Sequence, residues 1–436
     1  MARVVVIGAG IVGAACGYFL TRDGHDVTVL DRGPVGGGTT SRGEGNILVS
    51  DKAPGPELDL ARWSAALWHA LGADPGSGVH ADDLELDAKG GLVVATGEDA
   101  LAGLTAFAEA QAAAGVDCVP VSGDELSGYE PHLAPGLPGG VFYPGDQQVQ
   151  PVRAAAALLR AARAFGAQVR ADADLVGVRL DAGGAVRAVR AQGGDGDVDL
   201  PADVVINAAG TWGGEVSRRL GAPVPVLPRR GFILVTEPLP RVVRHKVYTA
   251  DYVANVASGD AGLETSVVVE GTRGGTVLIG ASRERVGFDA SVRYDVVRLL
   301  AAQAVRLFPT LADVSLMRVY RGFRPYCPDH LPVIGPDPRV SGVWHACGHE
   351  GAGIGLAPAT GALVADLLAG RTTRVSPDPF SPTRFEDLPQ PGSPGEPDDL
   401  PPAHSPSGAK IPAERAQGVT YRTARRLDDG AAGADR

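Results

Sequence analysis

The segment at residues 4–13 reads VVVIGAGIVG, and residues 27–30 read VTVL immediately before Asp31. The first apolar run predicts a buried strand, and the glycines after it predict a tight turn that opens a helix over residues 11–23. The second apolar run predicts a neighbouring strand that ends at the acidic residue. Strand, turn, helix, strand and carboxylate in this order predict a site for an adenine dinucleotide.

Each residue of this unit has a physical task. Gly8 allows the tight turn, Gly10 lets the backbone approach a pyrophosphate, and Gly13 lets the helix pack close to the sheet. The N-terminus of the helix, where N–H groups are unpaired, favours negative charge. Asp31 stands at the spacing where a carboxylate accepts hydrogen bonds from ribose hydroxyls.

The composition is that of a mid-sized folded enzyme. The chain has 436 residues and a net charge of −11, which favours two domains and argues against nucleic acid or an anionic membrane as partner. Its four cysteines (Cys16, Cys118, Cys327 and Cys347) have no metal-ligand spacing and no disulfide-rich context, so no metal is expected. The first strand begins at Arg3, and the apolar stretch 354–368 is interrupted by Pro358 and Asp366. These features predict a cytoplasmic protein.

The rest of the chain alternates between helical and extended patterns. Helices are predicted over residues 56–71, 101–114, 152–165, 292–307 and 356–369, and strands over 92–95, 168–170, 203–210 and 343–346. Residues 266–270 and 276–280 flank a Gly-rich turn and predict an antiparallel hairpin. Beyond about residue 376 the chain is rich in Pro, Gly and Ser, which predicts a disordered tail over 376–436.

Three further segments indicate that the dinucleotide is a flavin. Residues 36–46 offer backbone N–H groups and hydroxyls to a diphosphate, and their glycines let a flat ring lie against the backbone. The small residues of 207–212 let the chain pass close to a cofactor. The glycines of 348–355 open a second helix whose N-terminus can stabilise negative charge on a reduced flavin, a feature that NAD does not need. His349 lies among these glycines without an identifiable acidic partner, so packing is a better interpretation of it than catalysis.

Residues 3–372 resemble the family of FAD-dependent amino-acid and amine oxidoreductases that contains D-amino acid oxidase and dehydrogenase, glycine oxidase and sarcosine oxidase. The matching segments are GAGIVG at 8–13, GFRPYCPDHLPVIG at 322–335 and GHEGAGIGLAPATG at 348–361. The stretch SRGEGNILVSDK at 41–52, with PGPE at 54–57, resembles a branch that includes the FAD subunits of hydrogen cyanide synthase and opine oxidase.

The resemblance implies an α/β fold with two discontinuous domains. A Rossmann-like FAD-binding domain is expected from residues 1–55, 150–222 and 330–372. An inserted α+β substrate domain with an antiparallel sheet is expected from residues 56–149 and 223–329.

The resemblance also implies which residues contact FAD. They are Gly8, Gly10, Ile11, Val12, Gly13, Asp31, Arg32, Thr40, Ser41, Gly45, Asn46, Leu175, Gly210, Gly348, Gly351, Gly353 and Ile354. In sarcosine oxidase-like members the cysteine that links covalently to FAD falls where this chain has Arg324, so non-covalent FAD is expected. Lysine is scarce, and none is identifiable as the oxygen-activating lysine of sarcosine oxidases.

The implied reaction transfers a hydride from the α-carbon of an amino acid to flavin N5 and gives an imine. Arg324, in the FRP motif, matches the residue that holds the substrate carboxylate in D-amino acid oxidase and glycine oxidase, and a guanidinium suits that task. Arg321 has no motif support and is assigned a structural role. Tyr248 and Tyr252 are candidates to close the site by donating a hydroxyl, although packing is an equal alternative.

Three functions stay open from sequence. The first is an oxidase or dehydrogenase of a D-amino acid, glycine or an N-substituted relative. The second is the catalytic FAD subunit of a heteromeric dehydrogenase for proline, hydroxyproline or an opine, with an iron–sulfur partner. The third is a flavoprotein subunit without substrate turnover. The electron acceptor, whether oxygen, a quinone or a partner subunit, is open as well.

Overall fold

A computed structural model describes residues 1–387 of the chain, except residues 195 and 257. The part of the predicted tail beyond residue 387 lies outside the described residues. Residues 376–387 differ from the expectation of disorder. They form two short 3₁₀ turns, Asp378–Phe380 and Pro382–Phe385, and the side chain of Phe380 is fully buried in the main core.

A six-stranded sheet contains the first strand, β1 (Arg3–Ile7), near its centre. The other strands, in the order β18-β19-β12-β1-β2-β8, are β18 (Val333–Pro336), β19 (Val343–Cys347), β12 (Val204–Asn207), β2 (Asp26–Leu30) and β8 (Gln168–Arg170). All neighbouring pairs are parallel except β18 with β19. The middle of a parallel sheet of this kind is buried on both faces, which accounts for the apolar residues of β1 and β12.

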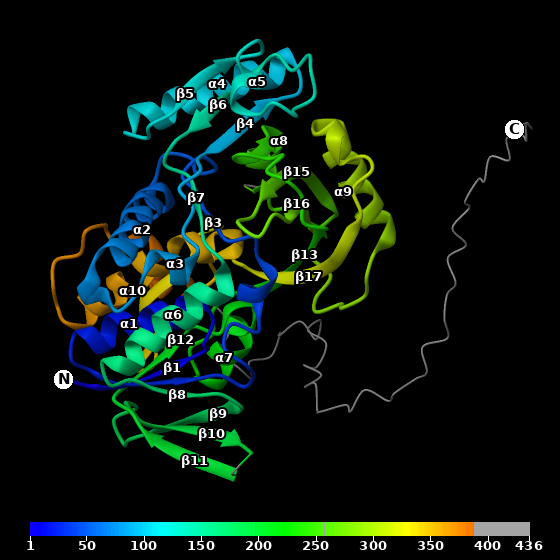
Figure 1. Cartoon of the computed structure of the whole chain (residues 1–436). Helices are drawn as coiled ribbons and strands as arrows, with labels where there is room; N and C mark the ends of the chain where they lie inside the picture. Colours follow the sequence, from blue (N-terminus) through cyan, green and yellow to red (C-terminus); the bar gives the residue numbers. More distant parts are fainter. Residues whose placement is uncertain (195, 257, 388–436) are drawn as a thin grey trace, which may run out of the picture. The chain divides into compact units, whose positions relative to one another are not determined.

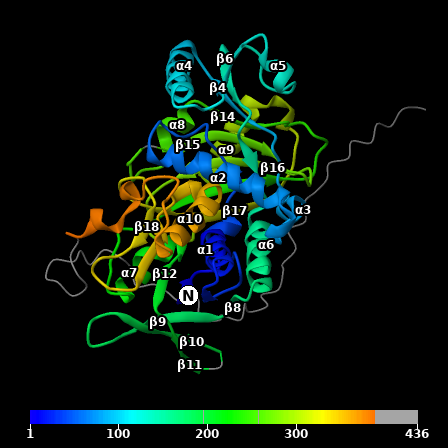
Figure 2. The ribbon, with the colours of Figure 1, turned by 90° about the vertical axis from the view of Figure 1, so that its left-hand side faces the viewer.

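Alternate residues of β1 pack into two different cores. Val4 and Val6 pack with the helices α1 (Ile11–Arg22), α6 (Pro151–Ala164) and α10 (Gly353–Leu368), together with α2 (Pro56–Ala73). Val5 and Ile7 pack on the opposite face. That face is covered by a three-stranded antiparallel sheet and the short helix α7 (Gly213–Arg219), as Figures 1 and 2 show. The three strands are β9 (Ala173–Leu180), β10 (Val186–Gly193) and β11 (Gly196–Pro201).

A second, eight-stranded sheet lies beyond the helices and is mainly antiparallel (Figure 1). Its order is β17-β13-β16-β15-β14-β4-β6-β5, with β17 (Leu316–Tyr326), β13 (Leu227–Thr236), β16 (Val277–Arg283), β15 (Glu264–Gly271), β14 (Lys246–Thr249), β4 (Gly91–Ala95), β6 (Gly139–Tyr143) and β5 (Val119–Ser122). Its separate core contains side chains of helix α9 (Tyr294–Leu307). The helix α4 (Glu98–Ala113) packs beside β6, and the short helix α8 (Asp251–Val256) packs beside β15.

The remaining elements are short and lie in the connections between these helices and strands. They are the 3₁₀ helices η1 (Thr39–Arg42), η2 (Pro75–Ser77), η3 (Gly210–Trp212), η4 (Pro309–Leu311) and η5 (Glu350–Ala352), the helices α3 (Ala81–Leu84) and α5 (Leu126–Tyr129), and the ribbon of β3 (Asn46–Ile47) with β7 (Gln147–Gln148). The predicted fold class, α/β with a parallel sheet and an additional antiparallel sheet, is confirmed. The predicted hairpin is the antiparallel pair β15 and β16.

One helical stretch within the described residues is long and apolar enough to cross a membrane. It spans Glu350–Leu368, and 61% of its 18-residue window is buried inside the protein. Its place between α1 and α2 is that of a core helix.

Two helical glycines offer a matched test of the packing around α1. A Cβ at Gly361 of α10 would lie 2.7 Å from the backbone of Ala15, whereas a Cβ at Gly103 of α4 meets nothing within 4 Å. Gly361→Ala is expected to lower the free energy of unfolding by about 1–3 kcal/mol, because the close contact must open. Gly103→Ala is expected to raise it by about 0.5–1 kcal/mol.

Chemical denaturation of the flavin-loaded proteins measures both effects. A neutral or stabilising result for Gly361→Ala contradicts the close contact between α1 and α10.

Candidate active site

The turn between β1 and α1 brings backbone against backbone. Gly8 has a φ of +114°, and a Cβ there would lie 2.4 Å from the carbonyl oxygen of Ala208, at the end of β12. A Cβ at Gly13 would lie 1.8 Å from the carbonyl oxygen of Gly8. Both glycines are therefore required by the protein's own packing.

The N-terminus of α1 keeps donors available for an anion. The N–H of Ile11 donates to Oγ1 of Thr40 at 3.0 Å. Among the described residues, no partner accepts from the N–H groups of Val12 and Gly13. At Gly10 a Cβ would meet only Oγ1 of Thr40 within 4 Å, so no protein backbone fills the space beside it. The predicted pyrophosphate position is thus flanked by free donors.

The carboxylate of Asp31 joins the ends of the first two strands. It accepts from the N–H of Ala9 at 2.7 Å and from the N–H of Gly33 at 2.9 Å. Burial raises the pKa of Asp31, although these two hydrogen bonds oppose the shift. The guanidinium of Arg32 lies 4.4 Å from the ring centroid of Trp212, so it covers the segment at 207–212.

Three further residues predicted to contact FAD are Gly210, Leu175 and Ser41. Gly210 has a φ of +56° and faces Thr39 of η1. Leu175 is buried in the core beneath β1 and β2, and its carbonyl accepts from Arg219 at 2.6 Å. Oγ of Ser41 donates within its own turn, to the carbonyls of Gly37 and Gly38.

The loop after β2 ends against β7. A Cβ at Gly45 would lie 1.9 Å from the carbonyl oxygen of Val149, so only glycine fits there. Nδ2 of Asn46 donates to Oε2 of Glu44 at 2.9 Å, whereas Oδ1 of Asn46 is buried without a hydrogen-bond partner in the described chain. An unpaired buried amide oxygen next to the predicted ring position is an available acceptor for a bound group.

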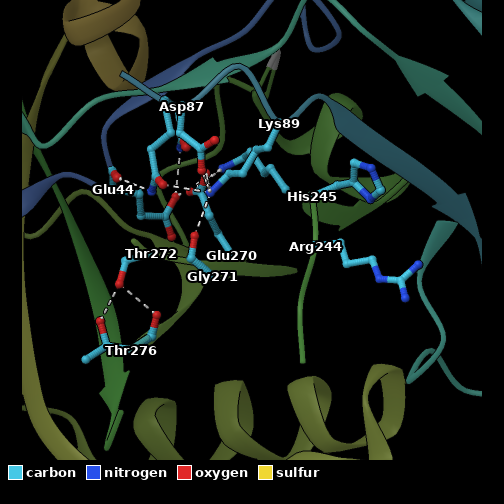
Figure 3. A network of polar contacts seen from close by, with 12 residues as sticks. Glu44, Asp87, Lys89, Arg244, His245, Glu270, Gly271, Thr272 and Thr276 are labelled. Atoms are coloured by element: carbon cyan, nitrogen blue, oxygen red, sulfur yellow. Dashed lines mark hydrogen bonds and ion pairs between the residues drawn. The ribbon is translucent and has the colours of Figure 1, made fainter. Parts of the chain in front are cut away.

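Glu44 anchors this loop to the second sheet through a chain of buried charges. Its carboxylate lies 3.4 Å from Nζ of Lys246, which in turn lies 3.7 Å from Glu270. Glu270 also lies 3.1 Å from Nζ of Lys89, and Figure 3 shows these two side chains pointing toward each other. Burial alone would lower the pKa of Lys246, but the two carboxylates outweigh it and raise that pKa. The cluster of Glu44, Lys246, Glu270 and Lys89 balances two positive charges with two negative ones.

The start of α10 lies on the opposite side of the loop. Gly348 has a φ of +76°, and Gly351 and Gly353 form the η5 turn and the first residue of the helix. The carbonyl of Ile354 accepts from the indole of Trp68 at 3.1 Å. Burial lowers the pKa of His349 to about 3, and its Nε2 contacts Oγ1 of Thr360 at 3.0 Å. This geometry supports a packing role for His349.

A small pocket lies between these elements. Its lining residues are Asn46, Leu48, Asp51, Lys52, Tyr252, Gly351, Ala352, Gly355 and Leu356. The pocket therefore contains residues of the predicted cofactor loop, the start of α10 and one predicted tyrosine. Lys52 is neutralised there by Asp51 at 2.7 Å.

Arg324 of β17 lies beside this pocket. A Cβ at Gly351 would lie 3.6 Å from Nε of Arg324, and Nη1 of Arg324 donates to the carbonyl of Ser282 at 2.8 Å. Burial, and then the positive charge of Arg283, lowers the pKa of Arg324 to about 10. Among the described residues, no carboxylate forms an ion pair with it. Its guanidinium is thus free to bind an anion.

The two predicted tyrosines have different surroundings. Tyr252 lines the pocket, and its ring centroid lies 4.9 Å from that of Tyr248. Tyr248 is fully buried, and its hydroxyl donates to Oγ of Ser50 at 2.6 Å. The structure therefore brings Tyr252 to the pocket with Arg324 and commits the hydroxyl of Tyr248 to an internal network.

That network ends in a buried carboxyl. Oγ of Ser50 donates to Asp146, which also accepts from the N–H of Val49 at 2.9 Å. Burial raises the pKa of Asp146 to about 7, and the hydrogen bonds that it accepts oppose the shift.

The residues present fit FAD. The donors at the start of α1 suit a pyrophosphate, and the carboxylate of Asp31 at the end of β2 suits ribose hydroxyls. Asn46 and the start of α10 border a pocket whose glycines suit a flat ring. A nucleotide-binding α/β fold with this second glycine-rich helix start defines a flavin-dependent oxidoreductase.

The sequence similarity of the chain to known proteins agrees with this class. The chain belongs to the FAD dependent oxidoreductase (DAO) family, whose model matches residues 3–367. The predicted family and the predicted cofactor are therefore confirmed.

Two proteins of similar sequence are a hydrogen cyanide synthase subunit and a glycine oxidase. The chain is 34% identical over 268 residues to hydrogen cyanide synthase subunit HcnC of Pseudomonas aeruginosa, covering 61% of this chain and 60% of that protein, less than two thirds of its length. It is 30% identical over 387 residues to glycine oxidase of Geobacillus kaustophilus, covering 87% of this chain and 96% of that one.

Two solved structures of oxidases have a similar fold. Glycine oxidase from Geobacillus kaustophilus matches with a TM-score of 0.77 and 29% identity, over 88% of this chain and 99% of that one. Iminodiacetate oxidase from Chelativorans matches with a TM-score of 0.73 and 26% identity, over 87% and 99% of the two chains.

Sequence reasoning did not identify several charged residues around the pocket. Arg283, Lys246 and Glu270 lie on strands of the second sheet, and no local motif marks them. Asp146 sits in a turn whose sequence reads as ordinary loop. Lys52 lay within the quoted branch motif, which was the only signal available.

The raised pKa of Asp146 predicts a pH-dependent stability. The folded protein binds this proton more tightly than the unfolded chain, so the contribution of Asp146 to stability falls as the pH rises from about 4 to about 7. Asp146→Asn, which imitates the neutral carboxyl, is expected to flatten the fall in melting temperature between pH 5 and pH 8.

Asp203→Asn is the matched control. In the parent protein, hydrogen bonds from Arg3 lower the pKa of Asp203 to about 2, so the carboxyl of Asp203 does not titrate between pH 5 and pH 8. Thermal unfolding at constant ionic strength gives the slopes. An unchanged slope in Asp146→Asn contradicts the assignment of a buried neutral carboxyl.

Proposed function

We propose that this chain oxidises the C–N bond of a small amino acid, such as a D-amino acid, glycine or an N-substituted relative, to an imine. The observation that carries the proposal is the guanidinium of Arg324, which lies beside Gly351 and has no acidic partner among the described residues. The names of the relatives, glycine oxidase and iminodiacetate oxidase, support the same substrate class.

FAD, when bound, supplies the hydride acceptor. The chain's own residues orient the substrate. Nη1 of Arg324 is held by the carbonyl of Ser282, which fixes the guanidinium and leaves its other donors for a carboxylate. Tyr252 borders the same pocket and limits how the side chain of a substrate lies. Positioning of this kind, rather than a base built into the protein, supplies most of the assistance.

We further propose that the two large sheets correspond to the two predicted domains. The strands of the six-stranded sheet all fall within residues 1–55, 150–222 and 330–372, and the strands of the eight-stranded sheet all fall within 56–149 and 223–329. Arg324 and Tyr252 both come from segments of the second group.

A heteromeric dehydrogenase is the second candidate. The relative HcnC is by name a subunit of a larger enzyme, so a partner chain that receives the electrons is consistent with the resemblance. After anaerobic reduction by substrate, reoxidation by oxygen or by a soluble quinone distinguishes an oxidase from a dehydrogenase that uses a quinone. Slow reoxidation by both favours the partner-dependent form.

We expect FAD to be held without a covalent bond. Burial raises the pKa of the Cys347 thiol to about 12 and also raises that of Cys327, so neither is a ready nucleophile. Acid precipitation of the purified yellow protein is therefore expected to release FAD intact into the supernatant. Flavin absorbance that stays with the precipitate contradicts the expectation.

Replacement of Arg324 tests the proposed reaction. Arg324→Leu is expected to retain FAD and to lose roughly 10²- to 10⁴-fold in kcat/KM for amino acids, because the carboxylate loses its partner. Arg324→Lys should recover only part of this loss, since an ammonium lacks the two-pronged geometry. Anaerobic flavin bleaching by a panel of amino acids and amines measures the effect.

Arg318→Leu is the matched control, because Arg318 is an exposed arginine of the same strand. It is expected to leave flavin bleaching unchanged. Equal losses for amino acids and simple amines in Arg324→Leu would assign that residue to the fold or to the flavin, and the proposal would fail.

A further inference from the structure

A second arginine near the pocket lacks a partner. Arg283 is the last residue of β16 and is only 4% exposed. Its Nη1 is buried without a hydrogen-bond partner, and within residues 1–387, leaving out 195 and 257, no carboxylate forms an ion pair with it. Its guanidinium lies 5.0 Å from the ring centroid of Tyr252, which lines the pocket.

Arg283 is also a neighbour of Arg324. Nη1 of Arg324 donates to the carbonyl of Ser282, one residue before Arg283. The side chain of Arg324 reaches Ser282 across Gly231 of β13, where a Cβ would lie 2.2 Å from Nη1 of Arg324. The backbone of β13 thus allows the two arginines to share one side of the pocket.

The other buried arginines of this sheet are compensated. Arg229 lies 2.8 Å from Glu264 and 3.6 Å from Glu350. Arg230 lies 2.8 Å from Glu284 and 2.6 Å from Asp289. The two buried guanidiniums of β13 thus have carboxylate partners, whereas Arg283 and Arg324 beside the pocket have none among the described residues.

Two buried positive charges without counter-charges are costly unless a ligand supplies them. A monocarboxylate supplies one negative charge for the two guanidiniums, so one positive charge stays uncompensated even where the carboxylate contacts both. A ligand with two carboxylates neutralises both. The ring of Tyr252 contributes a favourable face to Arg283 but no negative charge.

We propose that Arg283 and Arg324 together bind a substrate with two carboxylates, namely an amino or imino dicarboxylic acid. The inference rests on the proposed function, since Arg324 holds the carboxylate next to the reacting carbon. Arg283 then holds the distal carboxylate beside the ring of Tyr252. Arg283 is a specificity residue in this assignment and takes no part in hydride transfer.

Binding of inert carboxylates tests the pair without turnover. The flavin-loaded enzyme is titrated calorimetrically with malonate, succinate and glutarate, and with propionate, butyrate and valerate as their equal-length monocarboxylates. At least one dicarboxylate is expected to bind about 10- to 100-fold more tightly than its monocarboxylate. Arg283→Leu is expected to remove that difference and to leave monocarboxylate affinity nearly unchanged.

Arg285→Leu is the matched control variant. Arg285 also lies over a tyrosine, 4.9 Å from the centroid of Tyr326, but its Nη2 donates to the carbonyl of Gly259. It is expected to keep the preference for dicarboxylates. Arg283→Lys is expected to restore part of the preference and guards against a folding defect in Arg283→Leu, because it retains the charge.

The outcomes separate the two proposals. Monocarboxylate binding that depends on Arg324, without any gain from a second carboxylate, overturns the role of Arg283 and leaves the proposed function intact. Failure of every carboxylate to bind overturns both. If Arg283→Leu weakens both ligand classes equally, Arg283 acts on the flavin or the fold, and the dicarboxylate assignment is wrong.

Discussion

The whole site depends on one backbone contact, in which α1 begins directly against the turn that follows β1. A Cβ at Gly13 would overlap the carbonyl of Gly8, and a Cβ at Gly8 would overlap that of Ala208. This contact sets the height of the α1 N-terminus above the sheet, and with it the position of the free donors of Val12 and Gly13. Asp31 fixes the same turn from the next strand by accepting from Ala9. A rigid start of this kind lets one loop and one late helix converge on a common pocket.

The buried charges of the eight-stranded sheet are of two kinds: some are paired within the protein, and others are not. Glu44, Lys246, Glu270 and Lys89 form a neutral cluster that ties the loop after β2 to the eight-stranded sheet. Figure 3 shows three of its members, Glu44, Lys89 and Glu270. Such a cluster can stay buried because every charge has an opposite neighbour. Arg283 and Arg324 have none. This lack of a carboxylate partner at Arg283 and Arg324 indicates where a negatively charged ligand can bind.

The parts of the fold that sequence predicts well are the local ones. The turn at Gly8 to Gly13 and the hairpin of β15 and β16 follow from the spacing of adjacent residues. Arg283 and Asp146 could not be identified in this way. Arg283 meets Tyr252 from another element, and Asp146 accepts from Ser50, 96 residues earlier in the chain. Their environments arise from tertiary packing, and no periodicity in the sequence encodes it. Tyr248 and Tyr252 illustrate the same limit, because two similar tyrosines four residues apart acquire different partners.

Selectivity in this architecture follows from what remains unpaired after folding. The glycine turn and the neutral charge cluster are satisfied internally, so they contribute equally to every ligand and cannot discriminate between substrates. A guanidinium that the fold leaves unpaired does discriminate, because its desolvation cost is offset only by a ligand that reaches it. In the proposed function, Arg324 alone selects for a carboxylate beside the reacting carbon. With Arg283 on β16, which β13 separates from β17 in the sheet, the proposed site selects ligands by the distance between their two anionic groups. A single substitution on β16 is then sufficient to change the preferred substrate without altering the flavin site.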